Sequence, residues 1–182
     1  MIDYVTLMLV NMAAALILIG FFLLLAIAKE ENKSWAPPFL MSGLVAAVTG
    51  FTMTFTWPLP PPYNIAYGEM TVLLGLLLLG AGLAIAKGWD LFPLCFYAFI
   101  AGLAAILIGV RFITLSLSNA PLLTGIGFIL TGLCGVCSGL AVKAKKVLIL
   151  RLAGAMVLFA AAAIWLTIGG LAYWMHLLVP PK

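Results

Sequence analysis

The side chains that could do chemistry in this chain gather around one segment, residues 57–69, which reads Trp-Pro-Leu-Pro-Pro-Pro-Tyr-Asn-Ile-Ala-Tyr-Gly-Glu. The segment places Asn64, Tyr67 and the carboxylate of Glu69 at the mouth of the apolar run that follows. A carboxylate inside a membrane span costs about 3 kcal/mol, so it is a functional candidate that needs a partner. We expect the three prolines at 60–62 to form an extended polyproline segment, because proline lacks an amide hydrogen and has a fixed φ.

Arg111 is the candidate partner, because it lies at a similar distance from the basic turns as Glu69 does. We expect the two charges to pair, since each then offsets the desolvation of the other. The alternative is that Arg111 reaches past Phe112 to the membrane surface and that Glu69 meets solvent. An internal match places Asn11 at the position of Glu69 and Thr52 at that of Arg111. The expected polar vestibule therefore consists of Asn11, Thr52, Asn64, Tyr67, Glu69 and Arg111.

Other candidate residues are aromatic, titratable or thiol side chains. Phe55, Phe112 and Trp165 are candidates for a constriction in a passage. His176, the single histidine, is either part of an interfacial aromatic belt or a pH sensor. Cys134-x-x-Cys137 has a redox-like spacing, but thiols inside an apolar helix usually pack as small side chains. The sequence contains no nucleotide loop, metal-ligand cluster or catalytic triad, so we expect no metal and no cofactor, and the case for an enzyme is weak.

The composition identifies the elements that must position these residues. Of the 182 residues 66% are apolar and only 8% are charged, which is far from the composition of a soluble domain. Six apolar runs are long enough to span a bilayer. They are residues 4–28, 36–55, 63–86, 91–115, 121–142 and 147–174. The sequence therefore predicts a single all-α transmembrane domain with six helices and no separate soluble domain.

The basic residues indicate an orientation. Those that follow the first, third and fifth runs are Lys29, Lys33, Lys87, Lys143, Lys145, Lys146 and Arg151, whereas the opposite ends hold only Arg111 and Lys182. By the positive-inside rule these three turns are cytoplasmic, and both termini lie outside a multi-pass protein of the cell membrane. Contact with anionic lipid headgroups explains the net charge of +4 without a nucleic-acid partner, although the cluster at 143–146 also fits a polybasic patch for a protein partner.

An internal repeat is visible along the chain. Residues 25–29 and 83–87 both read Leu-Ala-Ile-Ala-Lys, and the glycine pair Gly43 and Gly50 is matched by Gly102 and Gly109. Together with the matching turn charges, these likenesses predict three tandem two-helix hairpins, at about residues 1–57, 58–118 and 119–182. We expect them to be related by a pseudo-threefold axis.

Two family resemblances follow from these motifs. Residues 56–60, Thr-Trp-Pro-Leu-Pro, and the segment 63–69 resemble a prokaryotic and largely archaeal family of small membrane proteins of unknown function. More distantly, the six-span layout and the stretch 88–99 are similar to the urea and amide channel family of bacteria. That resemblance implies a passive conduit for a small neutral solute, with several copies of the chain in a ring. The loops expected outside lack the histidines and acids of the proton-gated members, so we do not expect that form of gating.

Three functions remain open on the sequence. The first is a channel or facilitator for a small, neutral, urea-like solute with a polar outer vestibule. The second is a structural or accessory subunit of a larger membrane complex, and the third is an enzyme at the outer face. A channel requires that the vestibule residues converge on a continuous polar path, whereas an enzyme requires two titratable groups within hydrogen-bonding reach in one pocket.

Overall fold

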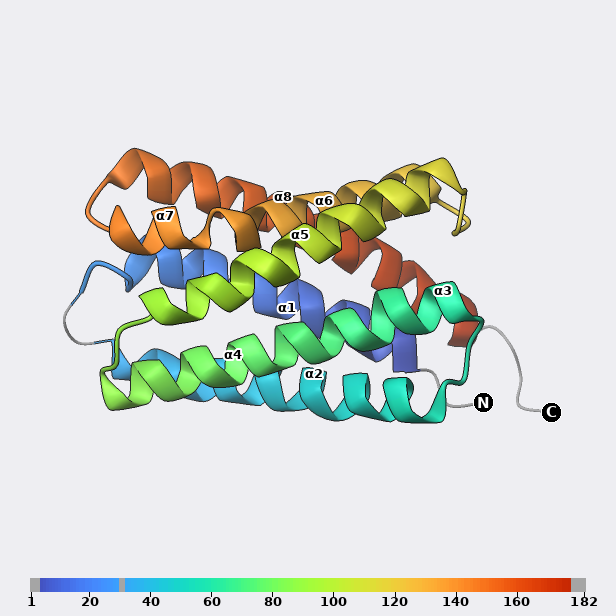
Figure 1. The fold of residues 1–182 in the computed structure, drawn as a ribbon, viewed down its shortest axis with the longest axis horizontal. Coiled ribbons are helices and arrows are strands. Elements are labelled where there is room, and N and C mark those ends of the chain that lie inside the picture. Colours follow the sequence, from blue (N-terminus) through green and yellow to red (C-terminus); the bar gives the residue numbers. More distant parts are fainter. Residues whose placement is uncertain (1–3, 30–31, 178–182) are drawn as a thin grey trace.

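The computed structural model describes residues 4–29 and 32–177, and the regular elements in these two ranges are all helical (Figure 1). They are α1 (Tyr4–Leu25), a short 3-10 helix (Lys33–Trp35), α2 (Ala36–Thr56), α3 (Pro61–Tyr63), a π-helix (Asn64–Glu69), α4 (Met70–Lys87), α5 (Phe92–Thr114), α6 (Pro121–Val136), α7 (Ser138–Lys143) and α8 (Leu148–Leu177). The long helices run along one common direction, with α1 between α8 and α2 (Figure 1).

Within residues 4–29 and 32–177, five helical segments are long and apolar enough to cross a membrane. They are Val5–Leu25, Lys33–Thr56, Pro61–Lys87, Leu94–Thr114 and Leu148–Leu177. Such a set of long, uninterrupted apolar helices is typical of a membrane protein and not of a soluble bundle of this size.

The run predicted as a fifth span, residues 121–142, is divided into α6 and α7 at Cys137. α6 has 16 residues, which at 1.5 Å per residue is about 24 Å, shorter than the roughly 30 Å of a bilayer core. α6 would therefore need α7 to complete a crossing.

The proline segment differs from the prediction. Only Pro60 is extended, with φ −53° and ψ 146°, whereas Pro61 and Pro62 occupy the first positions of α3. The first turn of a helix accepts proline because the amide hydrogens of that turn have no partner within the helix. The prolines therefore start a helix, which continues through the π-helix into α4 without an extended connection.

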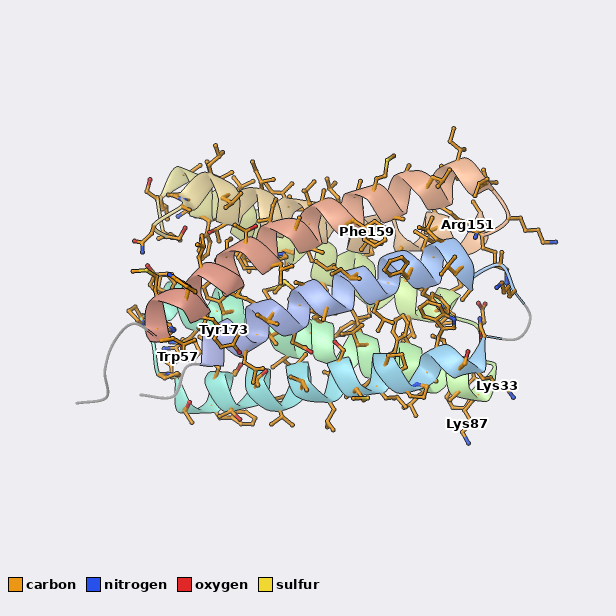
Figure 2. The ribbon with its side chains drawn as sticks, turned by 180° about the vertical axis from the view of Figure 1, so that it is seen from behind. Lys33, Trp57, Lys87, Arg151, Phe159 and Tyr173 are labelled. Atoms are coloured by element: carbon orange, nitrogen blue, oxygen red, sulfur yellow. The ribbon has the colours of Figure 1, made fainter. Side chains whose placement is uncertain are left out.

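The two ends of the bundle differ in character. Lys33, Lys87 and Arg151 lie at one end, which we call the basic end, and Trp57 and Tyr173 lie at the other (Figure 2). We call the second end the proline end, after the turn that leads into α3. The described ends of α1 and α8 at Tyr4 and Leu177 also lie there (Figure 1).

The helices pack most closely as three pairs, α2 with α4, α5 with α6, and α1 with α8. Glycines bring the backbones together in the first two pairs. A Cβ added to Gly75 would lie 2.5 Å from the Ala47 nitrogen, and one added to Gly132 would lie 2.5 Å from the Gly102 oxygen. Small residues permit such close approach in membrane helices. The closest packing thus joins helices on either side of the hairpin boundaries expected near 57 and 118.

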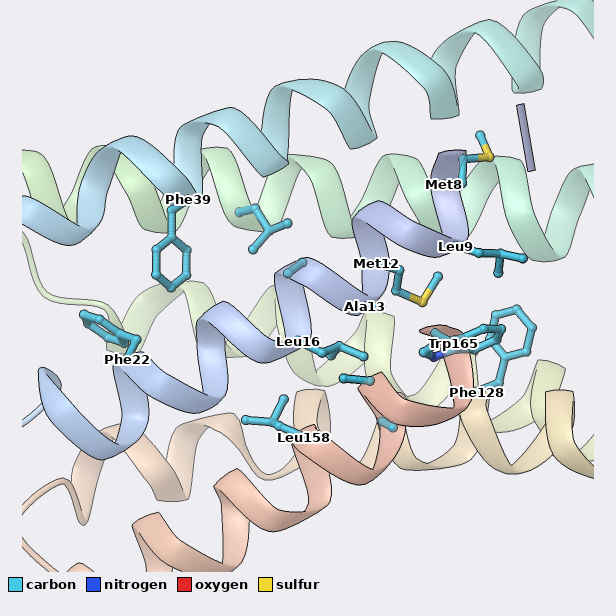
Figure 3. Packing of buried hydrophobic residues seen from close by; sticks show 14 of the residues in the cluster. Met8, Leu9, Met12, Ala13, Leu16, Phe22, Phe39, Phe128, Leu158 and Trp165 are labelled. Carbon is cyan, nitrogen blue, oxygen red and sulfur yellow. The ribbon is translucent and has the colours of Figure 1, made fainter. Parts of the chain in front are cut away.

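The core lies around α1. Met12 and Leu16 point from α1 toward α8 and toward the rings of Phe128 and Trp165 (Figure 3). At the basic end, Phe22 of α1 packs edge-on against Phe39 of α2, with the ring centroids 5.3 Å apart.

Candidate functional site

An apolar chamber of about 290 Å³ lies between the three helix pairs, and residues of all the long helices line it. Leucine, isoleucine, alanine, glycine and other apolar side chains make up most of its wall. The polar groups on the wall are few. They are the hydroxyls of Thr131 and Ser138 and the thiols of Cys95, Cys134 and Cys137.

A cluster of four buried rings closes the chamber toward the proline end. We call Tyr67, Phe112, Phe128 and Trp165 the aromatic cluster; each is at most 7% exposed. Phe128 lines the chamber, and its ring centroid lies 4.9 Å from that of Trp165, 5.4 Å from that of Phe112 and 5.9 Å from that of Tyr67. Figure 3 shows the Phe128 and Trp165 rings side by side. No open passage is therefore expected on this side, because the rings fill the interior.

The orientation of Trp165 is fixed by a short hydrogen-bond chain. Its Nε1 donates to the Thr131 Oγ1 at 3.0 Å, and the Thr131 hydroxyl donates to the Gly127 carbonyl oxygen at 2.8 Å. Gly127 also leaves space for the indole, because a Cβ at this position would lie 3.0 Å from Trp165 Cζ2. The indole N–H thus has a partner inside an otherwise apolar bundle, as a buried tryptophan requires.

A polar pocket of about 500 Å³ lies at the basic end, next to the chamber. Ile27, Ile85, Leu91 and Val142 line both spaces. The polar residues of this basic-end pocket are Lys29, Asn32, Asp90 and Lys145. The chamber therefore meets a charged mouth at the basic end and a closed aromatic wall at the other.

The expected pair of Glu69 and Arg111 is not formed. Both side chains are exposed, and within the described residues no salt bridge joins them. Glu69 is the last residue of the π-helix and Arg111 lies in the last turn of α5. Exposure at the proline end matches the alternative in which Arg111 reaches outward and Glu69 meets solvent.

The remaining vestibule residues have separate structural roles. Asn11 of α1 donates to the Ser42 carbonyl oxygen at 3.0 Å and accepts from the Ser42 hydroxyl at 3.2 Å, which links α1 to α2. The Thr52 hydroxyl donates to the Val48 carbonyl oxygen within its own helix at 2.7 Å. Asn64 is fully buried, accepts from the Leu59 amide at 3.2 Å and donates to the Leu59 carbonyl, so it holds the turn before α3. These groups do not converge on one polar path.

The candidate constriction residues divide into two groups. Phe112 and Trp165 lie in the aromatic cluster, whereas Phe55 is 78% exposed and stacks on Phe51 at the bundle surface. His176 is exposed near the end of α8 at the proline end. Cys134 lines the chamber, as noted above. The described residues contain no group of three His, Cys, Asp or Glu side chains that could hold a metal.

Two residues of the site were missed from the sequence. They are Phe128 and Thr131, which stand one helical turn apart in α6, a spacing that could have identified one shared face.

Arg151 of α8 donates from Nε to the Leu23 carbonyl at 2.8 Å and from a terminal nitrogen to the Leu24 carbonyl. A guanidinium at free carbonyls near a helix C-terminus is favourable. It anchors α8 to the end of α1.

Comparison with known protein families places the chain in one of them. Residues 1–178 match the family described as "Protein of unknown function (DUF981)". No curated protein and no solved structure matches the chain.

Proposed function

This chain belongs to that family of unknown function, and from its geometry we propose that it is a membrane facilitator for a small, uncharged solute of low polarity. The observation that carries the proposal is the apolar chamber of about 290 Å³ between the helix pairs. Apolar pockets with a few placed polar groups are typical of small-molecule sites. The basic-end pocket provides an entrance, and the aromatic cluster provides a closed gate.

The largely apolar wall of the chamber favours a solute less polar than urea. Its polar groups are two hydroxyls and three thiols, whereas burying an amide without hydrogen bonds costs at least about 1–3 kcal/mol. Ions are disfavoured far more strongly, because nothing on this wall replaces their hydration. In place of the urea-like solute expected from the channel resemblance, we propose a short amide with an apolar tail, because the buried methylenes of the tail offset the cost of burying the amide.

The gate would open by displacement of Phe128, because this ring separates the chamber from the other three rings. The π-helix that carries Tyr67 supports this placement, since such segments are frequent at functional sites. The vestibule residues Glu69 and Arg111 take no part in the proposed passage.

The test is solute flux into proteoliposomes, measured by stopped-flow light scattering with urea, acetamide and butyramide. We expect protein-dependent flux that is largest for butyramide relative to empty liposomes. Phe128→Ala should raise the flux several-fold, and Phe55→Ala is the matched control because it removes the same side chain from the exposed surface. Flux equal to that of empty liposomes for both the wild type and a folded Phe128→Ala would overturn the facilitator and favour the accessory-subunit hypothesis. Equal effects of the two variants would exclude Phe128 as the gate.

We also propose that the basic end is cytoplasmic, that both termini lie outside the cell membrane and that the chain forms homo-oligomers. The three-hairpin repeat belongs to the same proposal. It is supported by equivalent glycine contacts, since Gly43 faces the Leu79 nitrogen and the Gly75 oxygen, and Gly102 faces the Val136 nitrogen and the Gly132 oxygen. Labelling of single cysteines placed at either end in intact cells would test the orientation.

A further inference from the structure

We propose that the chamber and the basic-end pocket together bind an anionic amphiphile with one hydrocarbon chain in the chamber and its headgroup at Lys29 and Lys145. The proposal does not rest on solute transport. It rests on the continuity of an apolar space with a charged one, because Ile27, Ile85 and Leu91 line both.

Among the described residues of the pocket, two of the three charged side chains are cationic, which favours an anion. Lys29 and Lys145 line the pocket, and no salt bridge is formed by either lysine with a carboxylate of the described residues. The one described carboxylate in the pocket, Asp90, accepts a hydrogen bond from the Phe92 amide at 3.0 Å and so serves the start of α5. Asn32 adds an amide to the same wall. A carboxylate or phosphate headgroup would therefore meet two ammonium groups and a side-chain amide.

The length of the chamber favours a long hydrocarbon chain over a compact ligand. On α1 its lining runs from Leu23 to Met12, which is eleven helical steps or about 16 Å at 1.5 Å per residue. The chain would end against Phe128. Because α4 and α5 pack only sparsely against each other and both line the chamber, the hydrocarbon of a membrane lipid has a seam through which it could enter.

Binding to purified protein in a neutral detergent would be measured by titration calorimetry with octanoate, decanoate and laurate. Each methylene buried in the chamber contributes about 0.8 kcal/mol, so affinity should rise about fourfold per methylene along the series. Dodecanol and dodecylammonium test the headgroup, because they keep the chain and remove or reverse the charge. We expect both to bind at least tenfold more weakly than laurate.

The matched variants are two double substitutions at the same end of the bundle. Lys29→Gln with Lys145→Gln should weaken laurate binding about tenfold, whereas Lys87→Gln with Lys146→Gln makes the same change of charge outside the pocket lining and should leave binding unchanged. If the two double variants lose laurate affinity equally, the effect comes from the general surface charge, and the proposed site is overturned. If octanoate and laurate bind with equal affinity, the chamber does not bind the hydrocarbon chain. The proposal is also overturned if laurate does not bind and native mass spectra show no bound phospholipid.

The same experiment identifies the source of the amphiphile. Retention of an anionic phospholipid by the wild type, with its loss from the Lys29→Gln and Lys145→Gln double variant, would assign the site to a lipid of the bilayer. Laurate binding with no retained phospholipid would assign it to free single-chain acids. Either result supports the site, and neither depends on whether butyramide crosses proteoliposomes.

Discussion

Gly75→Ala and Gly132→Ala test whether backbone contact within the helix pairs holds the bundle together. The added Cβ atoms would lie 2.5 Å from the Ala47 nitrogen and from the Gly102 oxygen, whereas ordinary contact begins at 3.4 Å. Each pair must therefore separate locally by 3.4 − 2.5 = 0.9 Å, because backbone atoms cannot rotate away as a side chain can. Overpacking costs about 1–3 kcal/mol, and alanine recovers at most about 1 kcal/mol of helix propensity. We expect the free energy of unfolding of each variant to fall by about 1–2 kcal/mol.

The assay is reversible unfolding in mixed micelles with increasing dodecyl sulfate, followed by circular dichroism. Gly170→Ala is the control, because a Cβ at this position meets nothing within 4 Å. The free energy of unfolding of this variant should rise by up to about 1 kcal/mol, because alanine favours the helix over glycine. If Gly75→Ala and Gly132→Ala unfold at the same dodecyl sulfate concentration as Gly170→Ala, backbone contact does not hold the pairs. A large loss in only one of the two would refute the equivalence of the α2–α4 and α5–α6 pairs.

Three further predictions concern individual side chains, and the same unfolding assay checks them. Trp165→Phe and Thr131→Val should show a coupling energy of about 0.6 kcal/mol in a double-mutant cycle, the average for a hydrogen bond between membrane helices; a coupling of zero would mean that this bond does not fix the indole. Arg151→Gln should lower the free energy of unfolding by about 1.5–3 kcal/mol, because two carbonyl oxygens near the end of α1 lose a charged hydrogen-bond donor. The control Lys146→Gln should leave the free energy of unfolding unchanged. Glu69→Gln and Arg111→Gln should be additive, since no ion pair joins these exposed residues; coupling above 1 kcal/mol would restore the predicted pair.

The sequence was a good guide to the helices and a poor guide to the site. Long apolar runs need no further information to be recognised, because only helices of sufficient length satisfy the backbone in a bilayer. The Pro60–Pro62 segment was misjudged because the rule that proline breaks a helix does not apply in a first turn.

The interior could not be deduced because the helices are apolar on every side. In such a helix a ring that faces lipid and a ring that faces the core have the same sequence environment, so the periodicity that identifies a buried face in a soluble helix is missing. Phe55 and Phe112 illustrate this, since the first is 78% exposed and the second 1%. The expected pairing of Glu69 and Arg111 rested on depth along the helix, and depth does not determine the direction in which each side chain points around its helix axis.

The position of the chamber follows from the way the pairs are packed. Within the pairs α2–α4 and α5–α6, glycines place backbone against backbone and leave no space for a ligand. Between pairs the contacts are fewer, and α4 meets α5 only sparsely. Because tightly packed interfaces resist deformation whereas sparse ones separate at low cost, a ligand that enlarges the chamber should move the pairs as rigid units and open the α4–α5 seam first. The glycines then have a functional role as well as a structural one, since they confine the movement to the boundary at which the chamber lies.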